Sequence, residues 1–262
     1  MPAGPAAGPL GSGDTHPQED PLAEIRRPRS VSQSFLLGLL RSQLDGLVPG
    51  EWRPLDIVDL GGGTGGIASA LAADGHRLTV IDPSPDALAS LERRTAESGL
   101  TGRMIGRQGD AADLVALVGP GRVDVVLCHR VLEVVDSPSE ALSAMAQVLR
   151  PGGVLSLVVA QRHALVLTQA LAGHIALARR TLADTGRFDH DQLVRLVSRA
   201  GFVVRTSHGI GAIADHVPES LIEGEPGAYE ELTALETEIS TEPAFRAVAP
   251  QVQIFAQTDF SR

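Results

Sequence analysis

The chain lacks lysine and has a single cysteine. All 22 basic residues among its 262 residues are arginines, and 32 acidic residues bring the formal net charge to −10. A charge balance this acidic argues against broad electrostatic capture of nucleic acid. The lone Cys128 excludes an intrachain disulfide framework and a cysteine-rich zinc or iron–sulfur site. We therefore expect a cytoplasmic protein that binds no metal.

Long apolar runs are also missing. The longest stretch without Asp, Glu or Arg runs from His163 to Ala178, which is too short and too polar for a membrane span. Residues 1–28 hold six of the 17 prolines and no periodic apolar pattern, which predicts a disordered tail and no signal peptide. Within residues 29–54, apolar residues from Phe35 to Leu47 recur at spacings of three and four and predict an N-terminal helix.

From residue 55 to residue 262 the pattern predicts one α/β domain. Short apolar runs alternate with helical stretches; the runs are DIVDL, LTVID, MIGRQ, VDVVLC and VLSLVV. Five strands separated by helices predict a parallel sheet covered on both faces. FVVRTSH is a sixth strand, and VQIFAQT is a last strand that we expect to be antiparallel. A helix over residues 163–183 and a loop and helix over residues 209–241 are predicted insertions.

A glycine-rich loop, residues 59–66, joins the first strand to the first helix. Backbone N–H groups and the helix dipole face a ligand in such a loop. Gly61, Gly63 and Gly66 satisfy the G-x-G-x-x-G pattern, so a nicotinamide dinucleotide is one interpretation. Asp59 favours another, because an acid before the glycines repels a pyrophosphate but accepts hydrogen bonds from an α-amino group, as in S-adenosylmethionine. Alternatively, Asp59 only caps the turn.

Three further strand ends carry candidate ligand-binding residues. Asp82 ends the second strand, where an acid in this topology reaches two ribose hydroxyls. Asp110 and Ala111 follow the third strand, where small residues let an adenine lie flat; Asp110 is equally suited to cap a helix. His129 ends the fourth strand, opposite the glycine loop, as a ligand contact or a structural residue.

The motifs resemble those of class I S-adenosylmethionine methyltransferases. DLGGGTGG, VIDPS, QGDAADL, CHRVLEVVDSP and LRPGGVLSLVV occur in that family's order over residues 55–160. The chain more closely resembles the bacterial tRNA 5-carboxymethoxyuridine methyltransferase family, and this resemblance continues through HALVLTQALAGH, ADHVPE, LETEIS and EPAF. It implies a Rossmann-like fold with a seven-stranded, mostly parallel sheet, an antiparallel last strand, helices on both faces and a small helical cap.

The resemblance also implies the cofactor, S-adenosyl-L-methionine, and residues that bind it. Together with the candidates above, the predicted cofactor residues are Asp59, Gly61, Gly62, Gly63, Gly65, Asp82, Asp110, Ala111, Ala112 and His129. An arginine near the N-terminus, Arg29 or Arg41, is also implied, and the N-terminal helix is expected to cover this site. Ala160-Gln161-Arg162-His163 departs from the family's aromatic residue and Asn, which leaves the acceptor open.

The acceptor side is predicted from the insertions. Arg162 and His163 are the acceptor-side candidates, because the 163–183 and 209–228 segments follow strands whose carboxyl ends face the cofactor. A carboxylate acceptor, with a pKa of ~4, needs no general base. For a hydroxyl or amine acceptor the candidate bases are His163, Glu133 and His216, each of which also fits a structural role.

Charge bears on whether the acceptor is tRNA. Nine acids and no arginine lie between Arg205 and Arg246: Asp215, Glu219, Glu223, Glu225, Glu230, Glu231, Glu236, Glu238 and Glu242. A phosphate-binding strip is possible from Arg162, Arg179, Arg180 and Arg187, or these line a solvated helix face. The function hypotheses are a methyltransferase acting on tRNA or a small molecule, a nicotinamide-dependent oxidoreductase, and a non-catalytic S-adenosylmethionine-binding protein.

Overall fold

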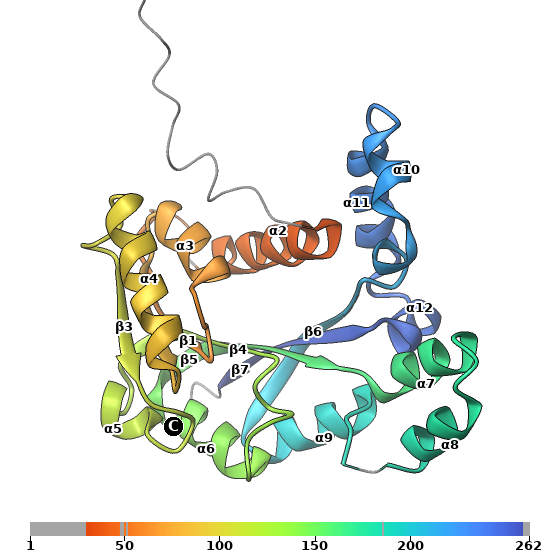
Figure 1. Cartoon of the computed structure of the whole chain (residues 1–262). Coiled ribbons are helices and arrows are strands. Elements are labelled where there is room, and N and C mark those ends of the chain that lie inside the picture. The colour runs from red at the N-terminus through yellow and green to blue at the C-terminus, as the bar shows by residue number, and fades with distance from the viewer. Residues whose placement is uncertain (1–29, 48–49, 51, 185, 259–262) are drawn as a thin grey trace, which may run out of the picture.

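A seven-stranded sheet forms the centre of the computed structural model, which describes residues 30–47, 50, 52–184 and 186–258 (Figure 1). The strands are β1 (Asp56–Leu60), β2 (Arg77–Asp82), β3 (Met104–Gln108), β4 (Val123–His129), β5 (Leu149–Ala160), β6 (Phe202–Ile210) and β7 (Gln251–Thr258). Their order is β3-β2-β1-β4-β5-β7-β6, and β7 is antiparallel to both of its neighbours. The predicted mostly parallel sheet with an antiparallel last strand is confirmed.

Helices cover both faces of the sheet (Figure 1). One face carries α2 (Val31–Asp45), α3 (Gly66–Ala73) and α4 (Pro85–Glu97); the other carries α5 (Leu114–Val118), α6 (Pro138–Val148) and α9 (His190–Arg199). Each layer buries its own apolar core, with Leu40 and Leu91 on the first face and Leu142 and Val197 on the second. Burying such side chains stabilises each layer by about 1.5–3 kcal/mol per residue.

Local sequence signals set where several of these helices begin. Ser84 and Ser137 accept hydrogen bonds from backbone N–H groups at the starts of α4 and α6, and each is followed by a proline in the first helical turn. At α9, Asp189 and Gln192 form a reciprocal capping box. These caps fix the residues at which the crossover helices begin.

Further helices gather at one side of the sheet (Figure 1). They are α7 (Arg162–Leu171), α8 (Ile175–Ala183), η1 (Ala214–His216), α10 (Glu219–Glu223), α11 (Ala228–Ile239) and α12 (Pro243–Val248). Where the sequence predicted one helix over residues 163–183, the structure has two, because Gly173 adopts a left-handed conformation (φ 82°) that ends α7. The segment predicted as a loop over residues 209–228 contains η1 and α10, and α12 was not predicted.

The helix α2 joins this side of the molecule to the sheet. Its leucines pack on the first face, while Val31 packs against Ala214 and Leu232 of the helical side. The Ser34 and Tyr229 hydroxyls are hydrogen-bonded to each other, which adds a polar link to α11. The predicted tail, residues 1–28, lies outside the described residues.

None of the helices in the described part of the chain is long and apolar enough to span a bilayer.

Candidate active site

The predicted site residues gather at one edge of the sheet. In the register, Leu60 at the end of β1 lies beside Ile81 of β2 and Cys128 of β4. Because these strands are parallel, their carboxyl ends share one edge of the sheet. The glycine loop, Asp82 and His129 therefore all lie at that edge. Open α/β sheets bind their ligands at this edge.

The glycine loop leaves no room for side chains at three of its positions, Gly61, Gly62 and Gly65; a Cβ on Gly65 would lie 2.3 Å from Leu91 Cδ1. Gly61 has a φ of 68°, and a Cβ there would lie 2.2 Å from Val131 Cγ2. A Cβ on Gly62 would lie 2.5 Å from Asp59 Oδ2. The backbone of the loop therefore packs closely on these neighbouring side chains, which only glycine allows.

Asp59 is a buried carboxylic acid without a cationic partner. It is 5% exposed, and no hydrogen bond or ion pair from residues 30–47, 50, 52–184 or 186–258 reaches its carboxyl group. Burial, with the nearby Asp82 charge, raises the pKa of Asp59 to about 7. A buried carboxyl group that no described cation neutralises is suited to pair with the positively charged α-ammonium group of S-adenosylmethionine. It would repel the negative charges of a pyrophosphate.

Asp82 holds the loop and retains acceptor capacity. One oxygen accepts from the Gly63 N–H at 2.9 Å and the other accepts from the Ser84 N–H at 2.9 Å. An ionised carboxylate offers about four lone-pair directions, so both oxygens can still accept from ribose hydroxyls. Asp82 thus links the glycine loop to the start of α4 at the predicted ribose position.

We expect Asp82→Ala to weaken S-adenosylhomocysteine binding by about 1.5–3 kcal/mol, the range for hydrogen bonds to a charged group. Because two backbone N–H groups lose their acceptor, we also expect the free energy of unfolding to fall by about 1 kcal/mol. Calorimetry and chemical denaturation measure the two effects. An unchanged dissociation constant would show that the ribose lies elsewhere.

The segment after β3 forms a tight turn at the predicted adenine position. Asp110 Oδ1 accepts from the Ala112 N–H at 2.7 Å, while the N-cap of α5 is Asp113. Asp110 therefore stabilises the turn and is not the helix cap. Ala111 is buried and Ala112 is exposed. Their contact with adenine stays a prediction.

His129 is held by a chain of buried polar groups. Its Nε2 lies 3.0 Å from Ser156 Oγ, and the Gln253 amide donates to the same hydroxyl at 3.0 Å. Gln253 also exchanges two amide hydrogen bonds with Gln43 of α2, at 3.0 and 3.1 Å. Ser156 and Gln253 are fully buried. This series of hydrogen bonds connects the end of β4 to α2, the helix expected to cover the cofactor.

Burial keeps the His129 ring neutral near pH 7, because it lowers the pKa of His129 to about 4. The Ser156 hydroxyl, which accepts from Gln253, can either donate to Nε2 or accept from it, so the ring proton can reside on either nitrogen. Nδ1 is buried and has no hydrogen-bond partner among the described residues.

Sequence reasoning missed Ser156, Gln253 and Gln43. Ser156 and Gln253 meet only because β7 pairs with β5 in a register that places Ser156 opposite Phe255. The only signal in the sequence was a polar residue within an apolar strand. Ser156 interrupts the apolar run VLSLVV, and Gln253 interrupts VQIFAQT. A polar residue inside a buried strand is expected to have a partner.

Glu133 follows His129 at the same edge. Glu133 Oε1 accepts from the Ala160 N–H at 2.7 Å and from Arg130 Nε at 3.0 Å, while Oε2 is buried without a partner in the described part of the chain. Arg130 has a φ of 63°, a strained value for a residue with a side chain. Glu133 thus has an established structural role in joining β4 to the end of β5.

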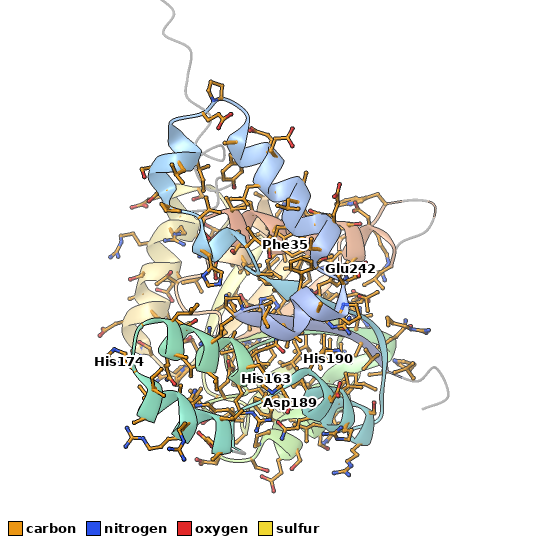
Figure 2. The ribbon with its side chains drawn as sticks, turned by 90° about the vertical axis from the view of Figure 1, so that its right-hand side faces the viewer. Phe35, His163, His174, Asp189, His190 and Glu242 are labelled. Atoms are coloured by element: carbon orange, nitrogen blue, oxygen red, sulfur yellow. The ribbon has the colours of Figure 1, made fainter. Side chains whose placement is uncertain are left out.

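The acceptor-side candidates Arg162 and His163 lie at the start of α7 and differ in environment. Arg162 Nη2 forms an ion pair with Asp189 Oδ2 at 2.7 Å, and their side chains are only 12% and 16% exposed. His163 is exposed on α7, on the side of the molecule that also carries Asp189 (Figure 2). Of the two side chains, only that of His163 is exposed, and its contact with an acceptor stays a prediction.

The N-terminal arginine candidates are also separated. Arg41 binds both oxygens of Asp74, at 2.7 and 3.1 Å. Asp74 caps the C-terminal end of α3, whereas the glycine loop enters its N-terminal end, and eight residues of helix span about 12 Å. Arg41 therefore does not lie at the loop, and Arg29 lies outside the described residues.

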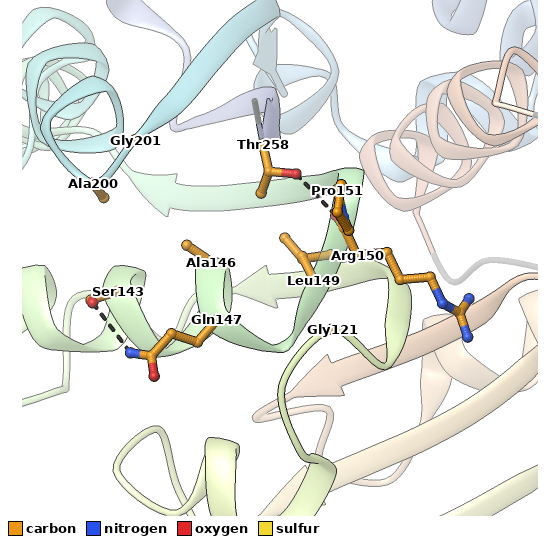
Figure 3. A pocket seen from close by; sticks show the side chains of 10 residues that line it. All are labelled: Gly121, Ser143, Ala146, Gln147, Leu149, Arg150, Pro151, Ala200, Gly201 and Thr258. Atoms are coloured by element: carbon orange, nitrogen blue, oxygen red, sulfur yellow. Dashed lines mark hydrogen bonds between the residues drawn. The ribbon is translucent and has the colours of Figure 1, made fainter. Parts of the chain in front are cut away.

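The cavity in Figure 3 does not belong to this site. It has a volume of about 340 Å³ and is lined by Gly121 before β4, Arg150 in β5 and Thr258 at the end of β7. These positions mark the amino edge of the parallel strands. Among the described residues, no group of three or more His, Cys, Asp or Glu could hold a metal ion.

Comparison with known proteins bears on this geometry. Residues 58–157 match the family described as "Methyltransferase domain". The chain is 28% identical over 219 residues to the tRNA 5-carboxymethoxyuridine methyltransferase of Escherichia coli K12, covering 80% of this chain and 82% of that protein. It is 31% identical over 149 residues to a ubiquinone biosynthesis O-methyltransferase of Burkholderia lata, covering 57% and 62% of the two chains.

A solved structure shares the fold. The putative sarcosine dimethylglycine methyltransferase from Galdieria sulphuraria superposes with a TM-score of 0.60 at 14% identity, over 87% of each chain. The nicotinamide interpretation of the glycine loop is wrong, because residues 58–157 match the methyltransferase domain; the buried Asp59 carboxyl group, which has no cationic partner among the described residues, also argues against a pyrophosphate. The chain is an S-adenosylmethionine-dependent methyltransferase with the class I fold, and its methyltransferase domain includes residues 58–157.

Proposed function

We propose that this enzyme methylates a carboxylate on a modified wobble uridine of tRNA. The observation that carries the proposal is the extent of the similarity. The match to the tRNA 5-carboxymethoxyuridine methyltransferase spans 219 residues, more than twice the 100 residues of the domain match, whereas the match to the ubiquinone O-methyltransferases spans 149 or fewer. The motifs HALVLTQALAGH, ADHVPE, LETEIS and EPAF, which carry the resemblance beyond residue 160, lie on the helical side of the molecule, which we expect to select the acceptor.

The site residues suit transfer to an acceptor that is already ionised. Methyl transfer from a sulfonium is an in-line displacement, in which the enzyme positions the nucleophile and excludes water. Bound S-adenosylmethionine supplies the methyl group; Asp59 would hold its ammonium group and Asp82 its ribose. His129, at the end of β4, would contact the cofactor. A histidine whose pKa is lowered to about 4 is a weak base, which fits a carboxylate acceptor that needs none.

A small-molecule acceptor is the second candidate, and a specific observation favours it. Four large apolar side chains are exposed on α7 and α12: Leu167, Leu171, Phe245 and Val248. Such side chains suit an apolar acceptor better than a nucleic acid. The acids on and around α10 and α11 point the same way, because they repel phosphate groups.

The proposal is tested with tRNA that carries 5-carboxymethoxyuridine and lacks its methyl ester. We expect the purified enzyme with S-adenosylmethionine to convert this nucleoside to the ester, measured by mass spectrometry of digested tRNA. With saturating cofactor, the rate should vary little between pH 7 and 9, because the acceptor carboxylate is fully ionised there. Asp82→Ala serves as the cofactor-deficient control.

Two results would contradict the proposal. Wild-type enzyme that methylates a small hydroxylated compound but leaves the tRNA nucleoside unchanged would favour the second candidate. A rate that rises tenfold per pH unit would indicate a hydroxyl or amine that must lose a proton before attack.

A further inference from the structure

A second cavity lies at the amino edge of the sheet, opposite the cofactor edge. Its volume is about 390 Å³, and it is lined at the starts of β1, β2, β4 and β5 and around β3. Five arginines and one acid, Asp56, provide its charged lining; the arginines are Arg77, Arg103, Arg107, Arg122 and Arg150. In a chain with a net charge of −10, this is a concentrated positive region.

The acids at this edge neutralise only part of that charge. Asp56 lies between Arg77 Nε at 2.6 Å and Arg150 Nη2 at 2.9 Å. Asp124 lies beside the cavity and pairs with Arg53 at 3.2 Å and with Arg150 at 2.7 Å. The hydrogen bond from Arg77 is the main factor that lowers the pKa of Asp56, so this acid stays ionised and paired.

The other three arginines have no carboxylate partner within the described ranges. Arg103 Nη1 donates to the Ala72 carbonyl at 3.4 Å, and Arg107 Nη1 donates to the Leu117 carbonyl. The Arg122 guanidinium has neither a hydrogen bond nor an ion pair with a described residue. Each guanidinium carries five N–H donors, so most donors of these three exposed side chains remain available.

We propose that this cavity binds phosphate groups. Planar guanidinium forks match phosphate oxygens in pairs, and three uncompensated charges suit a polyphosphate or successive phosphates of an RNA backbone better than a single carboxylate. The site is independent of the cofactor site, because β1 and β4, with five and seven residues, separate the two edges by about 16–23 Å. It does not rest on the identity of the methyl acceptor.

The test compares two double variants with the same change in charge. Arg103→Gln/Arg122→Gln removes charge from the cavity and leaves the Asp56 and Asp124 ion pairs intact. Arg179→Gln/Arg180→Gln removes two arginines of α8, which belong to the alternative phosphate-binding strip. Full-length protein is titrated with bulk tRNA and, separately, with inorganic tripolyphosphate at several salt concentrations. Circular dichroism of both variants verifies that they fold.

We expect the cavity variant to bind tRNA at least tenfold more weakly at low salt, with the slope of log K against log salt reduced by about two. The α8 variant should behave as wild type. If tripolyphosphate binds and tRNA does not, and the cavity variant loses that binding, the site takes small phosphates. Equal binding of both ligands by wild type and the cavity variant, no binding of either, or loss only in the α8 variant would overturn the proposal.

Discussion

Asp59→Asn is expected to weaken S-adenosylmethionine and S-adenosylhomocysteine binding while stabilising the cofactor-free protein at pH 8. The side chain is buried beside the glycine loop, and no cation in the described part of the chain neutralises it. With cofactor bound, the carboxylate would pair with the ammonium group, and loss of a buried charge pair of this kind costs about 2–5 kcal/mol of affinity. Asparagine has nearly the same size, so the Gly62 contact is retained.

The stability gain follows from the raised pKa of Asp59. An acid whose pKa is about 7 when folded and ~3.9 when unfolded binds its proton more tightly in the native state. The free energy of unfolding of the cofactor-free protein therefore falls as the pH rises from about 4 to about 7 and stays lower above that range. Asparagine never ionises, so the variant should avoid up to about 4 kcal/mol of this loss at pH 8.

Chemical denaturation at pH 5 and pH 8, with calorimetry for the cofactor, measures both effects. Asp136→Asn is the matched control. Asp136 is exposed and follows β4 at the carboxyl edge of the sheet, and its substitution changes the net charge by the same amount. If Asp59→Asn bound cofactor as tightly as wild type, the carboxylate would not hold the ammonium group. If the difference in unfolding free energy between the variant and the wild type were the same at pH 5 and at pH 8, Asp59 would not be a buried, uncompensated acid.

That the residues predicted to bind the cofactor gather at one edge of the sheet could be predicted, because the signals are local in the sequence. The glycine loop, Asp59 and Asp82 each lie within a strand–loop–helix unit, and parallel strands bring such units to one edge. The positive φ at Gly61 and the contact between Gly62 and Asp59 follow from that same loop. Neither conclusion needed knowledge of a distant segment.

The parts that could not be predicted depend on distant pairings. His129 and Ser156 meet across the parallel β4–β5 pair, and Ser156 and Gln253 meet across the antiparallel β5–β7 ladder, whose register the sequence does not specify. The division between α7 and α8 depends on one left-handed glycine, which a helical pattern tolerates at a cost of only ~1 kcal/mol. Helix propensity alone therefore favoured a single helix over residues 163–183.

Arg162 shows how a correct position can hide a structural role. The sequence placed it after β5, beside the predicted acceptor site, but gave no sign of its partner 27 residues later. In the structure its guanidinium is enclosed against Asp189, which also accepts from the Gln192 N–H at 2.9 Å and caps α9. Arg162 thus joins α7 to α9, and its replacement tests stability before it tests catalysis.

Arg162→Ala is expected to lower the free energy of unfolding by about 3 kcal/mol, because it leaves the enclosed Asp189 carboxylate without its cation. His163→Ala should change stability by less than about 0.5 kcal/mol, since the ring is exposed and has no described partner. Denaturant unfolding of both variants measures this contrast. A double-mutant cycle with Asp189→Asn should give a coupling energy of at least about 1.5 kcal/mol, because asparagine retains the cap but not the charge.

Activity then separates the acceptor roles of the two residues. If the helical side of the molecule positions the acceptor, His163→Ala should reduce methyl transfer while S-adenosylhomocysteine affinity stays within about 1 kcal/mol of wild type. At a temperature where Arg162→Ala remains folded, its activity should fall only to the extent that loss of the ion pair displaces α7. Full turnover by His163→Ala would remove this residue from the acceptor site, and the acceptor would then have to approach the cofactor past α2. A coupling energy near zero between Arg162 and Asp189 would show that the ion pair does not hold α7 against α9.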